Sequence, residues 1–599
     1  MQGKLRGDVA ATLFASLLEG PLPVSVSSEL STAPAEALLN PKSDFVLSVS
    51  PNMQLLSLVA LGGLAASAAA RSARSVGMKT ELSRPSFARP RQAAPLRRRQ
   101  VEPIITTEAS KKFVVNGTAG AIPDVNFDIG ESYAGLLPIS DKSNETSQLY
   151  FWFFPTENKD ADDEITIWLN GGPGCSSLEG FLQENGPISW QYGSGPKAVY
   201  NPWNWANLTN MVWVEQPVGT GFSQGNATAT SQEETAEEFL GFFKNFINTF
   251  GLNNRKVYIT GESYAGRYVP FIADAMLSKN DTEFYDVKGV MFYDPSVAED
   301  TILRDIPAVP FVDKWSGLFN FNETFLKDIH ERADKCGYTN YTETYLTFPP
   351  SGKLPEPTNN ATVEGCGLWK DIYDAVFYPN PCFDVYDIST TCPLLWDVLG
   401  FPGSFDYVVA GTEIYFNRTA VQKAINAPIQ PWAECQNGVL DTDTSGQSSW
   451  EVIPRIIDGL DRTIIAHGEL DYILLYNGTL MTIQNMTWGG LQGFQSPPTE
   501  NFYVPYHADL SMTSLSAKGI MGKVHTERKL TFVQQALSGH MVPQYQPSSA
   551  YRQLEFLLGR IESLESTVPF TTLPQGNSTN STGYAKRDLA AMKPAVELY

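Results

Sequence analysis

The sequence predicts an α/β protein built on a doubly wound, mostly parallel sheet that is interrupted by an inserted cap domain. Apolar β-branched and aromatic runs alternate with amphipathic stretches along most of the chain, as they do where strands and helices follow one another. This alternation stops between residues 296 and 412, where prolines and four of the six cysteines gather. The third observation is a strand, a sharp turn and a helix at residues 256–270, with a serine at the turn.

The first hundred residues differ in composition from the rest of the chain. Residues 53–70 have a short apolar run and an A-x-A end, which is typical of a signal peptide and too short for a membrane span. We expect translation to begin at Met53, which makes residues 1–52 an artefact of the assigned start. A genuine disordered extension ahead of an internal signal is the alternative. Residues 71–99 hold nine lysines or arginines against one acid and end in an arginine triplet. They read as a disordered basic propeptide with a processing site, or alternatively as a solvated charge run.

Residues 110–295 are the predicted first part of the core. An antiparallel hairpin is expected early, and a convincing amphipathic helix leads into the strand that carries the serine. The predicted strands lie at residues 112–115, 131–138, 148–154, 165–169, 211–214, 256–261 and 287–293, and the helix lies at residues 233–250.

The second part of the core is predicted at residues 413–565, after the inserted cap domain at residues 296–412. We expect a helix at residues 418–426, strands at residues 463–466 and 529–533, and a final helix after Pro547. The tail at residues 566–599 is polar and is predicted to be disordered and glycosylated. It carries no hydrophobic end, so no lipid anchor is expected.

Charge and cysteine usage exclude several classes of function. A net charge of -22 with a pI near 4.7 repels nucleic acid and anionic membranes. The six cysteines have no zinc-like spacing, so we expect disulfides and neither a metal nor another cofactor. Their connectivity and the oligomeric state cannot be derived from these residues.

Abundant glycosylation sequons point to the secretory pathway, with an extracellular or vacuolar destination. We expect N-glycans at these sites, which are Asn116, Asn144, Asn207, Asn226, Asn280, Asn322, Asn340, Asn360, Asn417, Asn477, Asn485, Asn577 and Asn580.

Ser263 is the candidate nucleophile. A serine at such a corner is held outside the regular backbone pattern, and the small residues Gly261, Ala265 and Gly266 let strand and helix approach each other. This is how an α/β-hydrolase presents its nucleophile, so the α/β-hydrolase fold is the predicted class. By itself the motif is equally compatible with an ordinary βα turn, because Ala265 replaces the second glycine of G-x-S-x-G.

The serine needs a base, and His540 is the best placed of the five histidines. It lies in a short glycine-bounded loop that follows a predicted strand near the end of the chain, where this fold carries its last catalytic residue. His330 lies in the cap, His507 and His525 lie in polar loop or hairpin regions, and His467 directly follows a strand and could be structural.

The orienting acid should lie between the serine and the histidine, at the end of a strand. Asp471 and Glu469 both follow the strand at residues 463–466. We choose Asp471, because the turn through Gly468 leaves it further along the loop toward the histidine. A helix-capping role for Asp471 is the alternative. The oxyanion donors are expected to be the backbone amides of Gly172 and Tyr264.

Four motifs in the same order resemble the serine carboxypeptidases, over about residues 110–565. They are Trp168-Leu-Asn-Gly-Gly-Pro-Gly-Cys-Ser-Ser177, Gly261-Glu-Ser-Tyr-Ala-Gly266, Gly539-His-Met541, and the stretch from Asn201-Pro-Trp-Asn-Trp205 to Phe222-Ser223. The resemblance implies cleavage of peptides one residue from a free C-terminus, by an acyl-enzyme mechanism.

The resemblance also implies roles for further residues. The terminal carboxylate of the substrate would be held by Asn170, Gly171, Glu184 and Glu262. A disulfide would join Cys175 to Cys435, and the remaining cysteines would close loops in the cap. Met541 becomes a candidate for the S1′ pocket, which receives the C-terminal side chain.

Glu262 directly precedes the nucleophile, and an acid can donate to a carboxylate only while it is protonated. Where two glutamates are neighbours, the pKa of one of them is raised, because like charges cannot both ionise cheaply. We therefore expect the peptidase to work best in acid.

The sequence departs from the family at two places. The stretch Met291-Phe-Tyr-Asp294-Pro-Ser296 lacks the usual Gly-Asn-Gly, and Leu474 stands where some members have cysteine. Both are expected near the surfaces that hold substrate side chains. An esterase or acyltransferase on the same fold, or an inactive secreted binding homologue, are the alternatives, although the triad and the oxyanion loop are intact.

Overall fold

The computed structural model describes residues 107–190, 197–392, 397–400, 413–507 and 517–572, which all belong to one compact unit. The predicted extension, signal peptide and propeptide lie outside the described residues. Within the described part of the chain, no helix is both long and apolar enough to cross a membrane.

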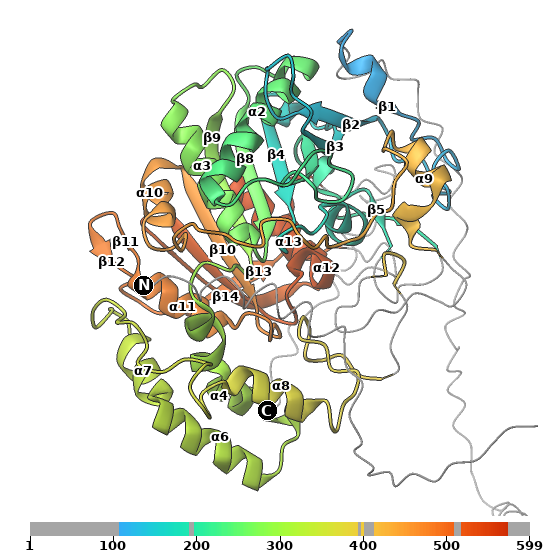
Figure 1. Cartoon of the computed structure of the whole chain (residues 1–599). Coiled ribbons are helices and arrows are strands. Elements are labelled where there is room, and N and C mark those ends of the chain that lie inside the picture. Colours follow the sequence, from blue (N-terminus) through green and yellow to red (C-terminus); the bar gives the residue numbers. More distant parts are fainter. Residues whose placement is uncertain (1–106, 191–196, 393–396, 401–412, 508–516, 573–599) are drawn as a thin grey trace, which may run out of the picture. The chain divides into compact units, whose positions relative to one another are not determined.

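An eleven-stranded mixed sheet forms the centre of the fold, in the order β1-β2-β3-β7-β4-β8-β9-β10-β15-β14-β13 (Figure 1). Its middle strands, from β7 to β15, pair in parallel, and both edges are antiparallel. The strands are β1 Val114–Val115, β2 Ser132–Pro138, β3 Gln148–Phe154, β4 Glu164–Leu169, β7 Met211–Glu215, β8 Lys256–Glu262, β9 Asp286–Tyr293, β10 Arg462–Gly468, β13 Glu500–Val504, β14 Gly519–Glu527 and β15 Leu530–Gln535.

The early antiparallel hairpin and the α/β-hydrolase class are confirmed, with Val114 paired to Tyr133. Two short hairpins lie outside the main sheet. They are formed by β5 Ile188–Ser189 with β6 Val199–Tyr200, and by β11 Thr487–Trp488 with β12 Leu491–Gln492.

Helices cover both faces of the sheet, because successive strand residues point to opposite sides. Ile165 and Ile167 of β4 pack in one apolar cluster together with α2, whereas Trp168 packs in the other together with α13. The helices of the core are α2 Gln232–Phe250, α3 Ala265–Lys279, α9 Thr419–Ala424, α10 Val452–Gly459, α11 Tyr476–Asn485, α12 Val542–Tyr545 and α13 Pro547–Leu557. Short helical turns are η2 Ser110–Phe113, η3 Lys159–Ala161, η4 Gly180–Glu184, η5 Trp205–Asn207 and η7 Tyr415–Asn417.

The insertion is helical in its described part, and its helices gather below the sheet in the view of Figure 1. Disulfides join Cys336 to Cys366 and Cys382 to Cys392. The helical elements are η6 Thr301–Asp305, α4 Ile306–Lys314, α5 Ser316–Phe319, α6 Glu323–Cys336, α7 Tyr338–Tyr345 and α8 Leu368–Val376.

The core of the insertion continues the apolar core of the hydrolase. Trp369 of α8 donates its indole N–H to the carbonyl of Tyr472 at 2.6 Å, and the Tyr472 hydroxyl donates to the carbonyl of Trp369 at 3.0 Å. Both side chains are buried in the same cluster as α2 and α3.

The first residues of the predicted disordered tail lie on the fold, so that boundary is wrong. Phe570 is buried against Trp203 and Tyr551, and the amide and hydroxyl of Thr571 both donate to Glu555 at 2.6 Å. An aromatic side chain in this otherwise polar segment supplies enough apolar area to hold it in place.

Candidate active site

Ser263 lies at the corner between β8 and α3, where its backbone is in the left-handed region with φ of 59°. A non-glycine residue in this region costs of order 1–3 kcal/mol, so the surroundings must hold it there. Its amide donates to the carbonyl of Tyr293 at 2.9 Å, and its carbonyl accepts from the amides of Gly266 and Ser296, each at 2.9 Å. The side chain is thereby fixed at the carboxyl end of the parallel strands.

The loop after β4, residues 170–177, is rich in glycine and lies against this corner; it is called the glycine loop. A Cβ placed on Gly171 would be 2.5 Å from the amide nitrogen of Tyr264 and 2.7 Å from the Cβ of Ser263. Only a glycine therefore lets the loop approach the nucleophile so closely.

The two expected oxyanion donors are the backbone amides of Gly172, in the glycine loop, and of Tyr264, next to the nucleophile. Gly172 has φ of 109°, and neither its amide nor that of Tyr264 donates to another described residue. The loop is anchored from behind, because Cys175 is bonded to Cys435 and the amide of Ser176 donates to the carbonyl of Glu434 at 2.7 Å.

We expect Gly171→Ala to lower kcat by about 10²- to 10³-fold, which is the cost of losing one oxyanion donor. The added methyl group pushes the loop away from Ser263, while the distant fold is left intact. Steady-state hydrolysis of a blocked dipeptide measures the effect. Gly317→Ala is the matched control, because a Cβ there meets nothing within 4 Å. Equal activity of the two variants would contradict this placement of the loop.

The structure brings the predicted base and acid together. His540 Nδ1 lies 2.8 Å from Asp471 Oδ2, and both side chains are buried. The other carboxylate oxygen of Asp471 accepts from the amides of Ile473 at 2.7 Å and Leu474 at 3.2 Å. Asp471 thus also holds the loop that follows it, but the helix-capping alternative is wrong, because α11 begins at Tyr476 with Leu475 as its N-cap and has no side-chain cap. Glu469 lies apart and accepts from Gln534 at 2.6 Å.

Burial on its own would raise the pKa of Asp471, but the charges and hydrogen bonds of His540 and His467 outweigh burial and lower it. The acid is therefore held ionised beside the imidazole. His540 Nε2 is buried and has no hydrogen-bond partner among the described residues. His540 Nε2 therefore forms no hydrogen bond with Ser263 in this structure. In serine hydrolases without substrate this contact is often long.

Asp294 is a buried neighbour of this pair that the sequence did not assign. It follows β9, its Oδ1 accepts from the amide of Gly468 at 2.8 Å, and acceptor or donor atoms of Asp294, Asp471 and His540 all lie within 4.8 Å of one another. Burial, and then the charge of Asp471, raise the pKa of Asp294 well above its ordinary value.

The stretch that holds Asp294 was expected near a surface that binds substrate side chains, and this stays a prediction. The carboxyl of Asp294 is fully buried behind the catalytic pair, because β9 lies between β8 and β10 in the sheet. Leu474, the other departure, is also buried, at 3% exposed.

His467 supports the acid from the end of β10. Its Nε2 lies 2.7 Å from the carbonyl of Leu474 and 3.5 Å from Asp471 Oδ2, and its ring is fully buried. This agrees with the structural role considered for it.

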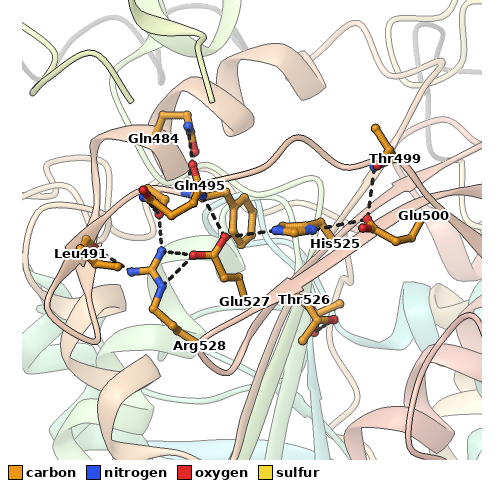
Figure 2. Close-up of polar contacts among 12 residues, drawn as sticks. Gln484, Leu491, Gln495, Thr499, Glu500, His525, Thr526, Glu527 and Arg528 are labelled. Atoms are coloured by element: carbon orange, nitrogen blue, oxygen red, sulfur yellow. Dashed lines mark hydrogen bonds and ion pairs between the residues drawn. The ribbon is translucent and has the colours of Figure 1, made fainter. Parts of the chain in front are cut away.

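The remaining histidines are engaged elsewhere. Figure 2 shows His525 between two carboxylates, with its Nδ1 3.4 Å from Glu500 Oε2 and its Nε2 3.2 Å from Glu527 Oε2. His330 contacts an exposed aspartate of the insertion, and His507 packs edge-on against an indole ring.

A cluster of polar side chains surrounds Asn170 at the end of β4. The Asn170 Oδ1 accepts from the indole of Trp168 at 2.7 Å and from the amide of Gly180 at 3.3 Å, which turns its NH₂ group toward three glutamates. That NH₂ group donates to Glu262 Oε1 at 2.9 Å, to Glu184 Oε1 at 3.5 Å, and to Glu179.

Two of these acids were predicted, and Glu179 was missed. Burial, and then like charges, raise the pKa of both Glu184 and Glu262 well above the ordinary value, and burial raises that of Glu179 to about 7. The second oxygens of Glu184 and Glu262 are buried without a hydrogen-bond partner among the described residues. Such carboxyls keep their protons in acid and can then donate to an anion.

Comparisons with known proteins agree with this geometry. The family model described as serine carboxypeptidase matches residues 123–559. A probable serine carboxypeptidase of Arthroderma benhamiae is 58% identical over 468 residues, which covers 76% of this chain and 88% of the relative. The serine-type carboxypeptidase F of Aspergillus niger is 47% identical, with 74% and 87% covered.

Among solved structures, a prohormone-processing carboxypeptidase from Saccharomyces cerevisiae has a TM-score of 0.60 at 22% identity, covering 76% of this chain and 98% of that one. At this identity the likeness shows the fold. The family model spans the nucleophile corner, the glycine loop, Asp471 and His540 together. The chain therefore belongs to the serine carboxypeptidase family.

Proposed function

We propose that Ser263, His540 and Asp471 carry out the serine carboxypeptidase reaction as nucleophile, base and orienting acid. Ser263 Oγ attacks the carbonyl carbon of the last peptide bond and passes its proton to His540 Nε2. His540 then gives this proton to the leaving amine, which departs as the C-terminal residue and leaves an acyl-enzyme. Water, activated by His540, releases the shortened peptide. Asp471 holds the imidazole in the required tautomer.

The tetrahedral intermediates carry a negative charge on the former carbonyl oxygen. The amides of Gly172 and Tyr264 are the proposed donors to this oxygen, because both lie beside Ser263 and neither is used within the described fold. Their contribution is independent of pH, since backbone amides do not titrate in the working range.

The observation that carries the substrate assignment is the polar cluster directly beside the nucleophile. The terminal carboxylate of a substrate lies one residue, or at most ~3.6 Å of chain, beyond the scissile bond. Asn170, Glu184 and Glu262 contact one another next to Ser263 and, with the amide of Gly171, would offer donors to such a carboxylate when the glutamates are protonated. We propose that these residues hold the terminal carboxylate.

The most direct test compares a blocked dipeptide, its C-terminally amidated twin and the corresponding ester across pH. We expect a strong preference for the free acid over the amide, and a larger preference in acid. Equal rates on all three substrates would overturn the carboxylate assignment. They would favour an esterase.

Substrate binding should weaken as pH rises. The pKa values of Glu184 and Glu262 are raised, so the donating, protonated forms exist below those pKa values and are lost above them. The ionised forms also repel the substrate carboxylate. If one proton must be bound, KM rises by about tenfold for each pH unit above the governing pKa.

We expect Glu262→Gln to flatten this rise of KM, because an amide donates at every pH. The KM-against-pH profile of the blocked dipeptide measures it. Glu238→Gln is a matched control, since Glu238 also has a pKa raised to about 7, by burial, but lies on α2 away from the cluster. A profile of Glu262→Gln that coincides with that of the parent enzyme would refute the role of Glu262.

For the parts outside the described residues we propose a signal peptide at residues 53–70 and a propeptide at residues 71–99. Together with the sequons they support a glycosylated enzyme in the vacuole or outside the cell. N-terminal sequencing of the intracellular precursor tests the start. A precursor that begins at Met1 would refute initiation at Met53.

A further inference from the structure

A small hollow lies where the insertion meets the second part of the core, on the side of the fold where α10 and α11 lie (Figure 1). Its volume is about 60 Å³. Four segments line it, which are residues 298–302, the insertion loop at residues 354–357, the turn before α10 and the end of α11. No residue assigned to catalysis or to carboxylate binding lines this hollow, so the proposed peptidase reaction does not use it.

Trp450 forms an apolar wall of the hollow and is 58% exposed. Its position is fixed, because the amide of the preceding Ser449 donates to the carbonyl of Val297 at 3.3 Å and the Trp450 amide donates to the carbonyl of Gln447 at 3.0 Å. The indole also lies close to Gly446, where a Cβ would be 3.3 Å from the ring. An indole held in the open beside a hollow offers apolar area that a ligand can remove from water.

Asn485 lines the same hollow from the end of α11, and it begins the sequon Asn485-Met486-Thr487. Its Oδ1 accepts from the amide of Leu354 at 2.9 Å, which holds the side chain in one orientation. No described residue accepts from its Nδ2, the atom to which an N-glycan is joined. Lys353 Nζ donates to the Asn485 carbonyl at 2.5 Å and to the Thr487 hydroxyl at 2.9 Å, so the insertion loop holds the whole sequon.

The sequon at Asn417 shows the contrast, because its amide group is used within the fold. Its Nδ2 donates to the carbonyl of Trp432 at 2.8 Å, and its Oδ1 accepts from the amide of Trp432 at 2.5 Å. A sugar on that nitrogen would meet the backbone of Trp432. At Asn485 a sugar can be attached while the hydrogen bond from Leu354 is kept, since that bond uses only the oxygen.

The size of the hollow limits what it can bind. Sites for free small molecules occupy about 300–1,000 Å³, so this hollow is too small to capture a free ligand. It has room for a small substituent, such as the acetamido group of N-acetylglucosamine, while the sugar ring lies across the opening. A sugar joined to Asn485 is held beside the hollow at a high effective concentration, so a weak site is sufficient to bind it.

We propose that this hollow binds the first N-acetylglucosamine of a glycan on Asn485, with the C–H face of the sugar on the Trp450 indole. The inference rests on the proposed glycosylation of the chain, and it adds a site at which one glycan becomes part of the fold. Burial of the apolar sugar face against the indole favours the contact. The carboxylates of Glu299 and Glu356 also line the hollow and can accept from sugar hydroxyls.

The test uses the secreted protein carrying oligomannose glycans, and an endoglycosidase that cuts between the two core N-acetylglucosamines. In the native protein we expect the glycan on Asn485 to be cut about tenfold more slowly than the glycan on Asn340, which lies exposed on α7. Mass spectrometry of the glycopeptides measures both sites in one sample. After denaturation both sites should be cut at the same rate.

Trp450→Ala should raise the cutting rate at Asn485 close to that at Asn340, because the sugar loses its apolar contact. Tyr378→Ala is the matched control, since Tyr378 is an aromatic residue of the insertion that is 96% exposed and does not line the hollow. It should leave the cutting rate at Asn485 unchanged.

The outcomes separate this inference from the glycosylation on which it rests. An occupied Asn485 that is cut as fast as Asn340 in the parent protein would overturn binding of the sugar in the hollow alone. Slow cutting that persists in Trp450→Ala would also overturn it, because something other than the hollow would then protect the glycan. Glycans at other sequons but none on Asn485 would overturn the modification site. A secreted protein without any glycan would overturn the proposed glycosylation itself.

Discussion

Ser263→Ala is expected to lower kcat by about 10⁶-fold, as loss of the nucleophile does in comparable serine hydrolases. The corner that carries Ser263 is built by backbone contacts with Tyr293, Gly266 and Ser296, and these remain when the hydroxyl is removed. The variant should therefore fold normally and still bind peptide, because the Asn170 cluster is intact. Single-turnover hydrolysis and equilibrium binding of a blocked dipeptide would measure the two properties separately.

Ser316→Ala is the matched control, because Ser316 is exposed on α5 of the insertion. It should retain the kcat of the parent enzyme. A Ser263→Ala variant with more than a small fraction of that kcat would show that another group attacks the peptide bond.

Asp471→Asn is expected to lower kcat by about 10⁴-fold, the loss seen when the acid of such a triad is replaced by its amide. The amide would offer an N–H to His540 Nδ1, so the imidazole would carry its proton on the wrong nitrogen. The hydrogen bonds from Ile473 and Leu474 can be kept by the amide oxygen, so the fold should change little. The kcat of the blocked dipeptide measures the effect, and thermal unfolding checks the fold.

The loss of kcat in Asp294→Asn can be compared with the loss in Asp471→Asn. The raised pKa of Asp294 favours its protonated form, with one oxygen accepting from Gly468 and the other without a partner among the described residues. An asparagine can accept from Gly468 and donate from its NH₂ group in the same way. We expect Asp294→Asn to cost less than about tenfold in kcat, and Asp294→Ala to cost more, because the alanine leaves Asp471 without this neighbour. Equal loss in Asp471→Asn and Asp294→Asn would show that both carboxylates must be ionised.

The order of strands and loops along the chain was sufficient to predict the paired acid and base. Asp471 and His540 each follow a strand, and the parallel pairing of β10 with β15 brings those two strand ends to one edge. The helix predicted at residues 233–250 also matches α2, because its aromatic residues repeat with a clear helical period. Local pattern was sufficient in both cases.

Contacts made through the sheet were not predictable in the same way. Asp294 meets Asp471 because β9 lies between β8 and β10, and this order is a property of the whole sheet. Glu179 lies two residues after the pair Ser176-Ser177, and this pattern is typical of an ordinary helix start. Its contact with Asn170 depends on the π-helical turn η4. The first residue of this turn, Gly180, lies so close to Trp168 and Asn170 that a Cβ there would clash. The roles of Glu184 and Asn170 came from family resemblance, since spacing alone does not join them.

The Cys175–Cys435 disulfide has a consequence for how the enzyme tolerates cleavage. It joins two points 260 residues apart, one before the insertion and one after it. A protease that cut the chain within residues 296–412 would leave Ser263 on one fragment and Asp471 with His540 on the other. The two fragments would stay covalently attached, and the sheet would still hold their strands side by side. A nicked enzyme should thus remain an intact catalyst that separates into two chains only when reduced and unfolded.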